Sequence, residues 1–273
     1  MLEQELFSLG HVKALRPGPN TLTFQGKPFR LHRTGNTIEW NKSKIDPAYR
    51  ISEQTGILWA YPAHTQPKIP VWPQYNPNHL TLTFSTVYKA DFKLVLENLY
   101  DLNHVAGTYG KINAQPKLKV ENVAPDQDVI RFDLTMEQTF DSVRRPVFTL
   151  LNYLSSKSED TESSHRVEVR FPSVLTFPNG FRLGEFFFLA IYPVDATYTG
   201  LSIFTVLDLP KTYGLLLQPL YRFQNNQITN EDRNILEQAA LNYPRKIRLA
   251  ADKPVDYART LWEQRLMSEL NSN

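Results

Sequence analysis

The chain has 273 residues, of which 41% are hydrophobic, 21% charged and 12% aromatic. This composition excludes a disordered or low-complexity protein, and the length is sufficient for a buried core. Lys and Arg total 30, Asp and Glu total 28, and the formal net charge is +2. The charge therefore gives no reason to expect nucleic-acid binding. The sequence has no cysteine, which excludes disulfides, a cysteine nucleophile and any metal or iron–sulfur site held by thiolates of this chain.

The distribution of apolar residues predicts a soluble, cytoplasmic protein. The first residues lack the basic region and apolar run of a secretory signal. The longest apolar runs, 186–192 and 214–217, are far shorter than the ~20 residues of a membrane span. Residues 213–217 and 221–223 are rich in Leu, Tyr and Phe, and as a short helix they would allow peripheral membrane contact.

The first part of the chain is predicted to consist of short strands joined by turns. Gln25-Gly26-Lys27 and Gln54-Thr55 separate apolar runs in the manner of hairpin turns. Prolines then recur up to Pro77 and favour an extended chain. We therefore expect a small β domain at 1–65, a connector at 66–77 and a larger domain at 78–273. The strands predicted in the small domain are 21–24, 28–31, 50–53 and 56–61.

The second part is predicted to mix helices with long strands. Residues 91–109 show apolar residues at helical spacing, and two late segments are also predicted to be helices. Successive strands without helices between them indicate an antiparallel sheet, hence an α+β fold whose concave face would hold an apolar pocket. The predicted strands are 129–138, 165–177, 181–192 and 201–209, and the predicted late helices are 230–241 and 255–270.

The most informative stretch lies in the first of these helices. Asn98, Asp101 and His104 recur every three residues and would lie along one side of the helix. A carboxylate one turn from an imidazole can hold the ring's far N–H, as metal-binding histidines require. Asp232 places another acid at the predicted start of a late helix.

Together these segments resemble the catalytic half of Rieske-type non-haem iron oxygenases, in the group of vanillate demethylase, pheophorbide a oxygenase and chlorophyllide a oxygenase. The strand pair around Trp59 and the segment 251–259 also resemble parts of this family. The resemblance implies a helix-grip (START/Bet v 1-like) sheet with long helices, preceded by a small truncated Rieske-like β domain. It also implies that His104 and Asp232 are ligands of a mononuclear iron, with Asp101 supporting His104 in an active enzyme.

The sequence departs from the family pattern at two places. Tyr109 stands where the family has its second histidine, and no cluster-binding Cys or His loop lies between Arg33 and Arg50. A Tyr109 phenolate could complete the metal ligands but would favour ferric over ferrous iron. The expected cofactor is thus at most a mononuclear Fe(II)/Fe(III) ion, without an iron–sulfur cluster.

Structural interpretations account for the same residues. His104 fits a hydrogen-bonded core histidine with Asp101 as its partner. Asp232 follows Thr229 by three positions, the spacing of a helix capping box. Phe187 fits either core packing or a pocket wall, because alternate residues of a strand face opposite sides. His165 falls in a predicted polar loop without an oriented acid, so a hydrolase triad is not expected.

The leading hypothesis is a cluster-less, catalytically inactive oxygenase homologue. It would bind a hydrophobic aromatic or tetrapyrrole-like ligand in a pocket that includes Asn98 and Phe187, or act as an assembly factor. One alternative is an active mononuclear iron oxygenase that receives electrons from a separate Rieske or ferredoxin protein. Another is a purely structural subunit of a larger complex. The expected partners are thus a hydrophobic small molecule, a protein complex or an electron donor.

Overall fold

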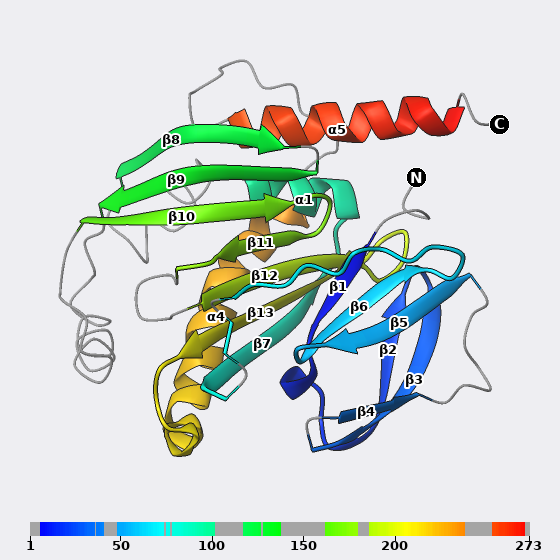
Figure 1. The fold of residues 1–273 in the computed structure, drawn as a ribbon, viewed down its shortest axis with the longest axis vertical. Coiled ribbons are helices and arrows are strands. Elements are labelled where there is room, and N and C mark those ends of the chain that lie inside the picture. Colours follow the sequence, from blue (N-terminus) through cyan, green and yellow to red (C-terminus); the bar gives the residue numbers. More distant parts are fainter. Residues whose placement is uncertain are drawn as a thin grey trace.

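The computed structural model describes residues 6–35, 37–40, 48–73, 75–76, 78–101, 117–126, 128–137, 162–179, 186–237 and 253–270. Within these residues every strand pair is antiparallel, as the sequence predicts. The strands form one seven-stranded sheet and two three-stranded sheets. Figure 1 shows the large sheet with α1 and α4 behind it and the N-terminal strands beside it.

The seven-stranded sheet has the order β7-β13-β12-β11-β10-β9-β8. The predicted single strand 165–177 is in fact two strands, because Pro172 has no N–H to donate and the chain turns before β11. Strands β7 and β8 were not predicted from the sequence. The bounds are β7 Leu80–Tyr88, β8 Lys117–Asp126, β9 Val129–Glu137, β10 Glu162–Arg170, β11 Val174–Phe177, β12 Phe186–Pro193 and β13 Thr199–Leu207.

The N-terminal strands form the sheets β1-β6-β5 and β2-β3-β4. Both predicted hairpins are present, and their turn residues have positive φ, as two-residue hairpin turns require. Gln25 and Gly26 have φ of 50° and 75°, and Thr55 and Gly56 have φ of 53° and 80°. The bounds are β1 Phe7–His11, β2 Gly18–Phe24, β3 Lys27–Thr34, β4 Thr37–Trp40, β5 Tyr49–Gln54 and β6 Ile57–Pro62, with a short 3-10 turn η2 at Val12–Ala14.

The described helices are α1 Phe92–Tyr100, α4 Gly214–Leu236 and α5 Lys253–Leu270, with the 3-10 turn η5 Lys211–Tyr213 leading into α4. The helix predicted at 255–270 is confirmed as α5. Helix α4 begins at residue 214, which is sixteen residues before the predicted start at 230. Pro219 lies inside α4, where the carbonyl of exposed Leu215 loses its helical partner on the solvent side. No described helix is long and apolar enough to cross a membrane.

The two faces of the large sheet have different neighbours. On β13, the Thr205 hydroxyl bonds the Tyr221 hydroxyl of α4 at 3.0 Å. The adjacent Phe204 points the other way and contacts the His11 ring of β1, with centroids 4.9 Å apart. This alternation is the period-two geometry of a strand. One face is therefore covered by helices and the other, at its β7–β12 end, by the N-terminal strands.

Aromatic side chains fill the contact between the N-terminal strands and the large sheet. Trp59 of β6 stacks on Trp72 of the connecting segment, with centroids 6.3 Å apart and an interplanar angle of 18°. Both rings meet Phe188 of β12 edge to face. Trp59 and Phe188 are almost completely buried. The N-terminal part of the chain is thus held to the large sheet by a packed aromatic core.

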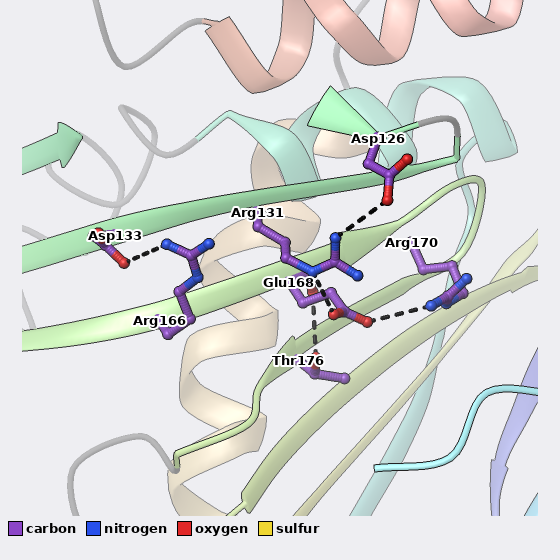
Figure 2. Close-up of polar contacts among 7 residues, drawn as sticks. All are labelled: Asp126, Arg131, Asp133, Arg166, Glu168, Arg170 and Thr176. Carbon is purple, nitrogen blue, oxygen red and sulfur yellow. Dashed lines mark hydrogen bonds and ion pairs between the residues drawn. The ribbon is translucent and has the colours of Figure 1, made fainter. Parts of the chain in front are cut away.

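The same face at the other end of the sheet carries ion pairs instead of apolar packing (Figure 2). Glu168 of β10 lies between Arg131 and Arg170, and Arg131 also reaches Asp126. Arg166 and Asp133 form a separate pair at 2.9 Å. These side chains are partly exposed, so this half of the face is polar.

Candidate functional site

Helix α1 holds the first predicted site residues. The carboxylate of Asp91 caps its N-terminus by accepting from the Lys93 N–H at 2.8 Å. The side chains of Phe92, Val95 and Leu96 are buried on the inner side of the helix. The helix ends at Tyr100, because Asp101 adopts φ −82° and ψ 87°.

This ending changes the expected geometry of the Asn98, Asp101 and His104 motif. Asp101 is the C-cap residue, and its N–H bonds the carbonyls of Glu97 and Asn98. The helical spacing predicted through residue 109 therefore stops at Tyr100 in the described part of α1. His104 and Tyr109 lie outside the described residues.

Asp101 lies near a positive charge from α5. Arg259 donates from Nη2 to Oε2 of Glu97 at 2.6 Å. The pKa of Arg259 is held above its usual value first by the hydrogen bond to Glu97, with a smaller contribution from the Asp101 charge. The C-terminal end of α1 is thus tied electrostatically to α5. No local sequence pattern indicates that Arg259 lies beside Glu97 and Asp101, because the two segments are far apart in the chain.

Asp232 lies on the inner side of α4 and is 8% exposed. It is in the helix interior, so the predicted capping role with Thr229 is wrong. Thr229 instead donates its hydroxyl to the Asn225 carbonyl at 2.8 Å. The negative charge of Asp232 reaches Tyr88 of β7, whose pKa is raised first by burial and then by this charge. The carboxylate is therefore directed toward the helix-facing side of the sheet.

Of the three predicted iron ligands, only Asp232 is among the described residues. Within the described part of the chain, no three His, Cys, Asp or Glu side chains come together. A carboxylate suits iron, but a facial iron site needs two further ligands. The described residues alone do not make an iron site.

The helix-facing side of the sheet is lined by aromatic residues near its centre. Phe187 of β12 packs edge to face on Phe177 of β11, with centroids 5.4 Å apart. The His165 ring lies 5.9 Å from the same Phe177 ring. His165 belongs to β10 and pairs with Leu134, so the strand predicted to begin at residue 165 is confirmed and the polar loop predicted around His165 is wrong.

Phe187 and its neighbours alternate between the two faces, as the sequence predicts. Phe186 and Phe188 are buried in the aromatic core against the N-terminal strands. Phe187 points to the opposite face and is only partly buried. Asn98, the other predicted pocket residue, is partly buried on α1. Phe187 is therefore placed on the side of the sheet that the helices cover.

A surface hollow of about 610 Å³ lies between the start of α1 and the end of α4. Its lining includes Lys89, Asp91, Arg233 and Glu237. The Lys89 N–H donates to Glu237 Oε1 at 3.0 Å. This hollow is charged and therefore differs from the apolar pocket that the sequence predicts.

Residues 88–267 match the family model described as the vanillate O-demethylase oxygenase C-terminal domain. The chain belongs to this family. The family resemblance seen in the sequence and the helix-grip architecture that it implies are both confirmed. Members of the family are oxygenases that use mononuclear non-haem iron. No curated protein sequence matches the chain.

Solved structures of Rieske oxygenases share the fold. Dicamba monooxygenase bound to dicamba has a TM-score of 0.68 at 13% identity, and the match covers 98% of this chain and 99% of that chain. NdmA of Pseudomonas putida CBB5 with caffeine has a TM-score of 0.59 at 14% identity, and the match covers 95% of this chain and 89% of that chain. A third match is a quaternary ammonium Rieske monooxygenase, described in connection with carnitine oxidation and inter-subunit electron transfer. Its TM-score is 0.61 at 12% identity, and the match covers 97% of this chain and 89% of that chain. At these identities the likeness establishes the fold alone.

Proposed function

We propose that this chain is a cluster-less, catalytically inactive Rieske-oxygenase homologue that binds a hydrophobic aromatic or tetrapyrrole-like ligand or acts as an assembly factor. The observation that carries the proposal is the absence of cysteine from a chain with the family's fold. A Rieske cluster needs two cysteine thiolates. Electrons for oxygen activation therefore have no cluster in this chain through which to pass.

The iron ligands expected from the family pattern support the same proposal. Tyr109 replaces the second histidine of that pattern. One imidazole and one carboxylate bind a divalent metal weakly unless a third ligand joins them. The missing cysteines affect the cluster and Tyr109 affects the iron site. These are the two parts of the family's fold that only catalysis requires.

The side chains on the helix-facing side of the sheet support an aromatic ligand. Phe177 and Phe187 offer ring edges and faces, which favour offset or edge-to-face contacts with another ring. His165 adds one polar group beside them. An apolar surface with few polar groups is typical of small-molecule sites.

The test is a titration of the purified chain with a soluble free-base porphyrin, followed by quenching of tryptophan fluorescence. We expect saturable binding that weakens at least tenfold in Phe187→Ala. Val71→Ala is the matched control, because Val71 is 61% exposed and outside this face. Non-saturable quenching, or equal binding by the two variants, would contradict the proposal.

The second candidate is an active iron oxygenase supplied with electrons by a separate donor protein. The buried position of Asp232 inside α4 supports it. Iron content after growth in iron-rich medium distinguishes the candidates, with Asp232→Ala as the control for specific binding. Iron in both wild type and Tyr109→His, together with oxygen consumption when a reductase and ferredoxin are added, favours the active enzyme. Iron gained only by Tyr109→His favours the inactive homologue. A chain that binds neither iron nor porphyrin would favour a structural subunit.

The domain division and location expected from the sequence remain part of this proposal. We infer a vestigial β domain at 1–65, a connector at 66–77 and a ligand-binding domain at 78–273, in a cytoplasmic protein. The grouping of β1 to β6 apart from the seven-stranded sheet supports this division. Limited proteolysis that releases a stable fragment beginning within 66–77 would test it.

A further inference from the structure

The first three turns of α4 expose apolar side chains to solvent. Leu215 is 90% exposed, Leu216 57% and Phe223 63%. With Pro219, they share an arc of roughly 100° on a helix of about 3.6 residues per turn. Leu217, on the opposite side, is buried against β7 and β13. We call Leu215, Leu216, Pro219 and Phe223, together with Tyr213 of η5, the α4 apolar patch.

The patch is confined to one end of the helix. Farther along the same outward side, the exposed residues are Asn226, Asn230 and Asn234. Tyr213 is 39% exposed and lies immediately before the helix. Figure 1 shows that α4 begins at the lower end of the molecule, beyond the edge of the large sheet. The apolar side chains therefore form a projecting tip.

Two exposed basic residues flank this tip in the sequence. Lys211 and Arg222 are exposed, and the sequence has no acidic residue between Asp208 and Glu231. Asp208 itself lies 3.7 Å from His79. The pKa of Lys13 is lowered by burial and by the charges of Lys211 and Arg33, so Lys211 lies within electrostatic reach of Lys13.

The size of the patch argues against a stable protein partner. A large side chain exposes ~200 Å² when free, so the patch offers on the order of 500 Å². A stable protein interface needs about 800 Å² on each partner. Interfacial membrane binding has no such requirement, because each apolar side chain enters the headgroup region individually and nearby cations add attraction to anionic lipids.

We propose that the α4 apolar patch binds the surface of an anionic lipid bilayer. Leu215, Leu216 and Phe223 enter the headgroup region, and Lys211 and Arg222 contact lipid phosphates. Tyr213 lies at the level of the interface, as amphipathic aromatic rings do. The proposal is independent of the ligand and of iron, because it concerns the outward side of α4.

The test is co-sedimentation of the full chain with two kinds of vesicle: phosphatidylcholine alone, and equal parts of phosphatidylcholine and phosphatidylglycerol. We expect binding to the anionic vesicles that is at least tenfold stronger than to neutral ones and that falls as salt is added. The double variant Leu215→Ser/Phe223→Ser should lose at least tenfold in binding, and Lys211→Glu several-fold. Because Leu215 and Phe223 are exposed, the double variant is expected to fold.

Val71→Ser and Lys68→Glu are the matched controls, because both residues are exposed and lie in the Pro-rich segment. They should bind anionic vesicles as the wild type does. Absence of wild-type binding, or equal losses in controls and patch variants, would overturn the proposal. Self-association that disappears in the double variant, without vesicle binding, would overturn it in favour of a second copy of this chain.

Discussion

Nε2 of His11 lies 2.8 Å from the hydroxyl oxygen of Tyr75, inside the contact between the N-terminal strands and the large sheet. Nδ1 of the same ring accepts from the Lys13 N–H at 3.0 Å. The proton therefore resides on Nε2, which donates to the tyrosine. Burial, with the nearby charges of Lys13 and Arg33, lowers the pKa of His11 to about 3.

This histidine should make the protein less stable in acid. The unfolded chain binds a proton below about pH 6.5, whereas the native chain binds it only near the lowered pKa of about 3. Stability therefore rises with pH across this window, by up to about 1.4 kcal/mol per pH unit. His11→Asn should cost about 1–2 kcal/mol at neutral pH through the lost bond to Tyr75. Urea unfolding at several pH values should show this difference shrinking below pH 6.5, and a constant difference would contradict it.

Gly10 of β1 should not tolerate a side chain. Its φ is +98°, and a Cβ there would overlap the side chain of Ser202 on β13. Gly18, with φ +92° and nothing within 4 Å of such a Cβ, is the matched control. Gly18→Ala should cost about 1–2 kcal/mol from backbone strain, and Gly10→Ala about 1–3 kcal/mol more from overpacking. Chemical denaturation measures both, and adding Ser202→Gly should return Gly10→Ala to the Gly18→Ala value.

Trp59 should contribute strongly to stability through the aromatic core. Trp59→Ala should lower the free energy of unfolding by about 3–5 kcal/mol, because it leaves a cavity against Trp72 and Phe188. Trp59→Phe should cost less than half as much, since it keeps a ring and removes an indole N–H that has no partner among the described residues. Exposed Val71→Ala should change stability by less than about 0.5 kcal/mol. Equal effects of Trp59→Ala and Val71→Ala on denaturant midpoints would refute this role.

Glu168 should be the most important residue of the ion pairs in Figure 2. It is 14% exposed at the side chain and accepts from Arg131 at 3.1 Å and Arg170 at 3.4 Å. Glu168→Gln should cost about 1–2 kcal/mol, because two half-buried guanidinium groups lose a charged partner. Asp133→Asn, which affects one more exposed pair, should cost less. Thermal unfolding at low and high salt measures both, and a larger effect at Asp133 would reverse this ranking.

The candidate site shows where local reasoning succeeds and where it fails. The alternation of Phe186, Phe187 and Phe188 is local, so the sequence predicts correctly that Phe187 faces away from its neighbours. The three-residue spacing from Thr229 to Asp232 matches a capping box, so the sequence predicts Asp232 at a helix start. Helix α4 instead begins at Gly214 and runs through Pro219, since packing of its inner side against the sheet outweighs the low helix propensity of proline.

Local sequence patterns are enough to predict many of the antiparallel strands, the two hairpin turns, the start of α1 and the lack of thiolate ligands, because alternation, turn residues, helical spacing and composition are read from neighbouring positions. The packed fold is needed to show that Arg259 meets the end of α1, that the charge of Asp232 reaches Tyr88, and that His11 is buried beside Tyr75. Each of these depends on side chains that are far apart in the chain, and burial and charge bring them together only when the sheet and helices pack.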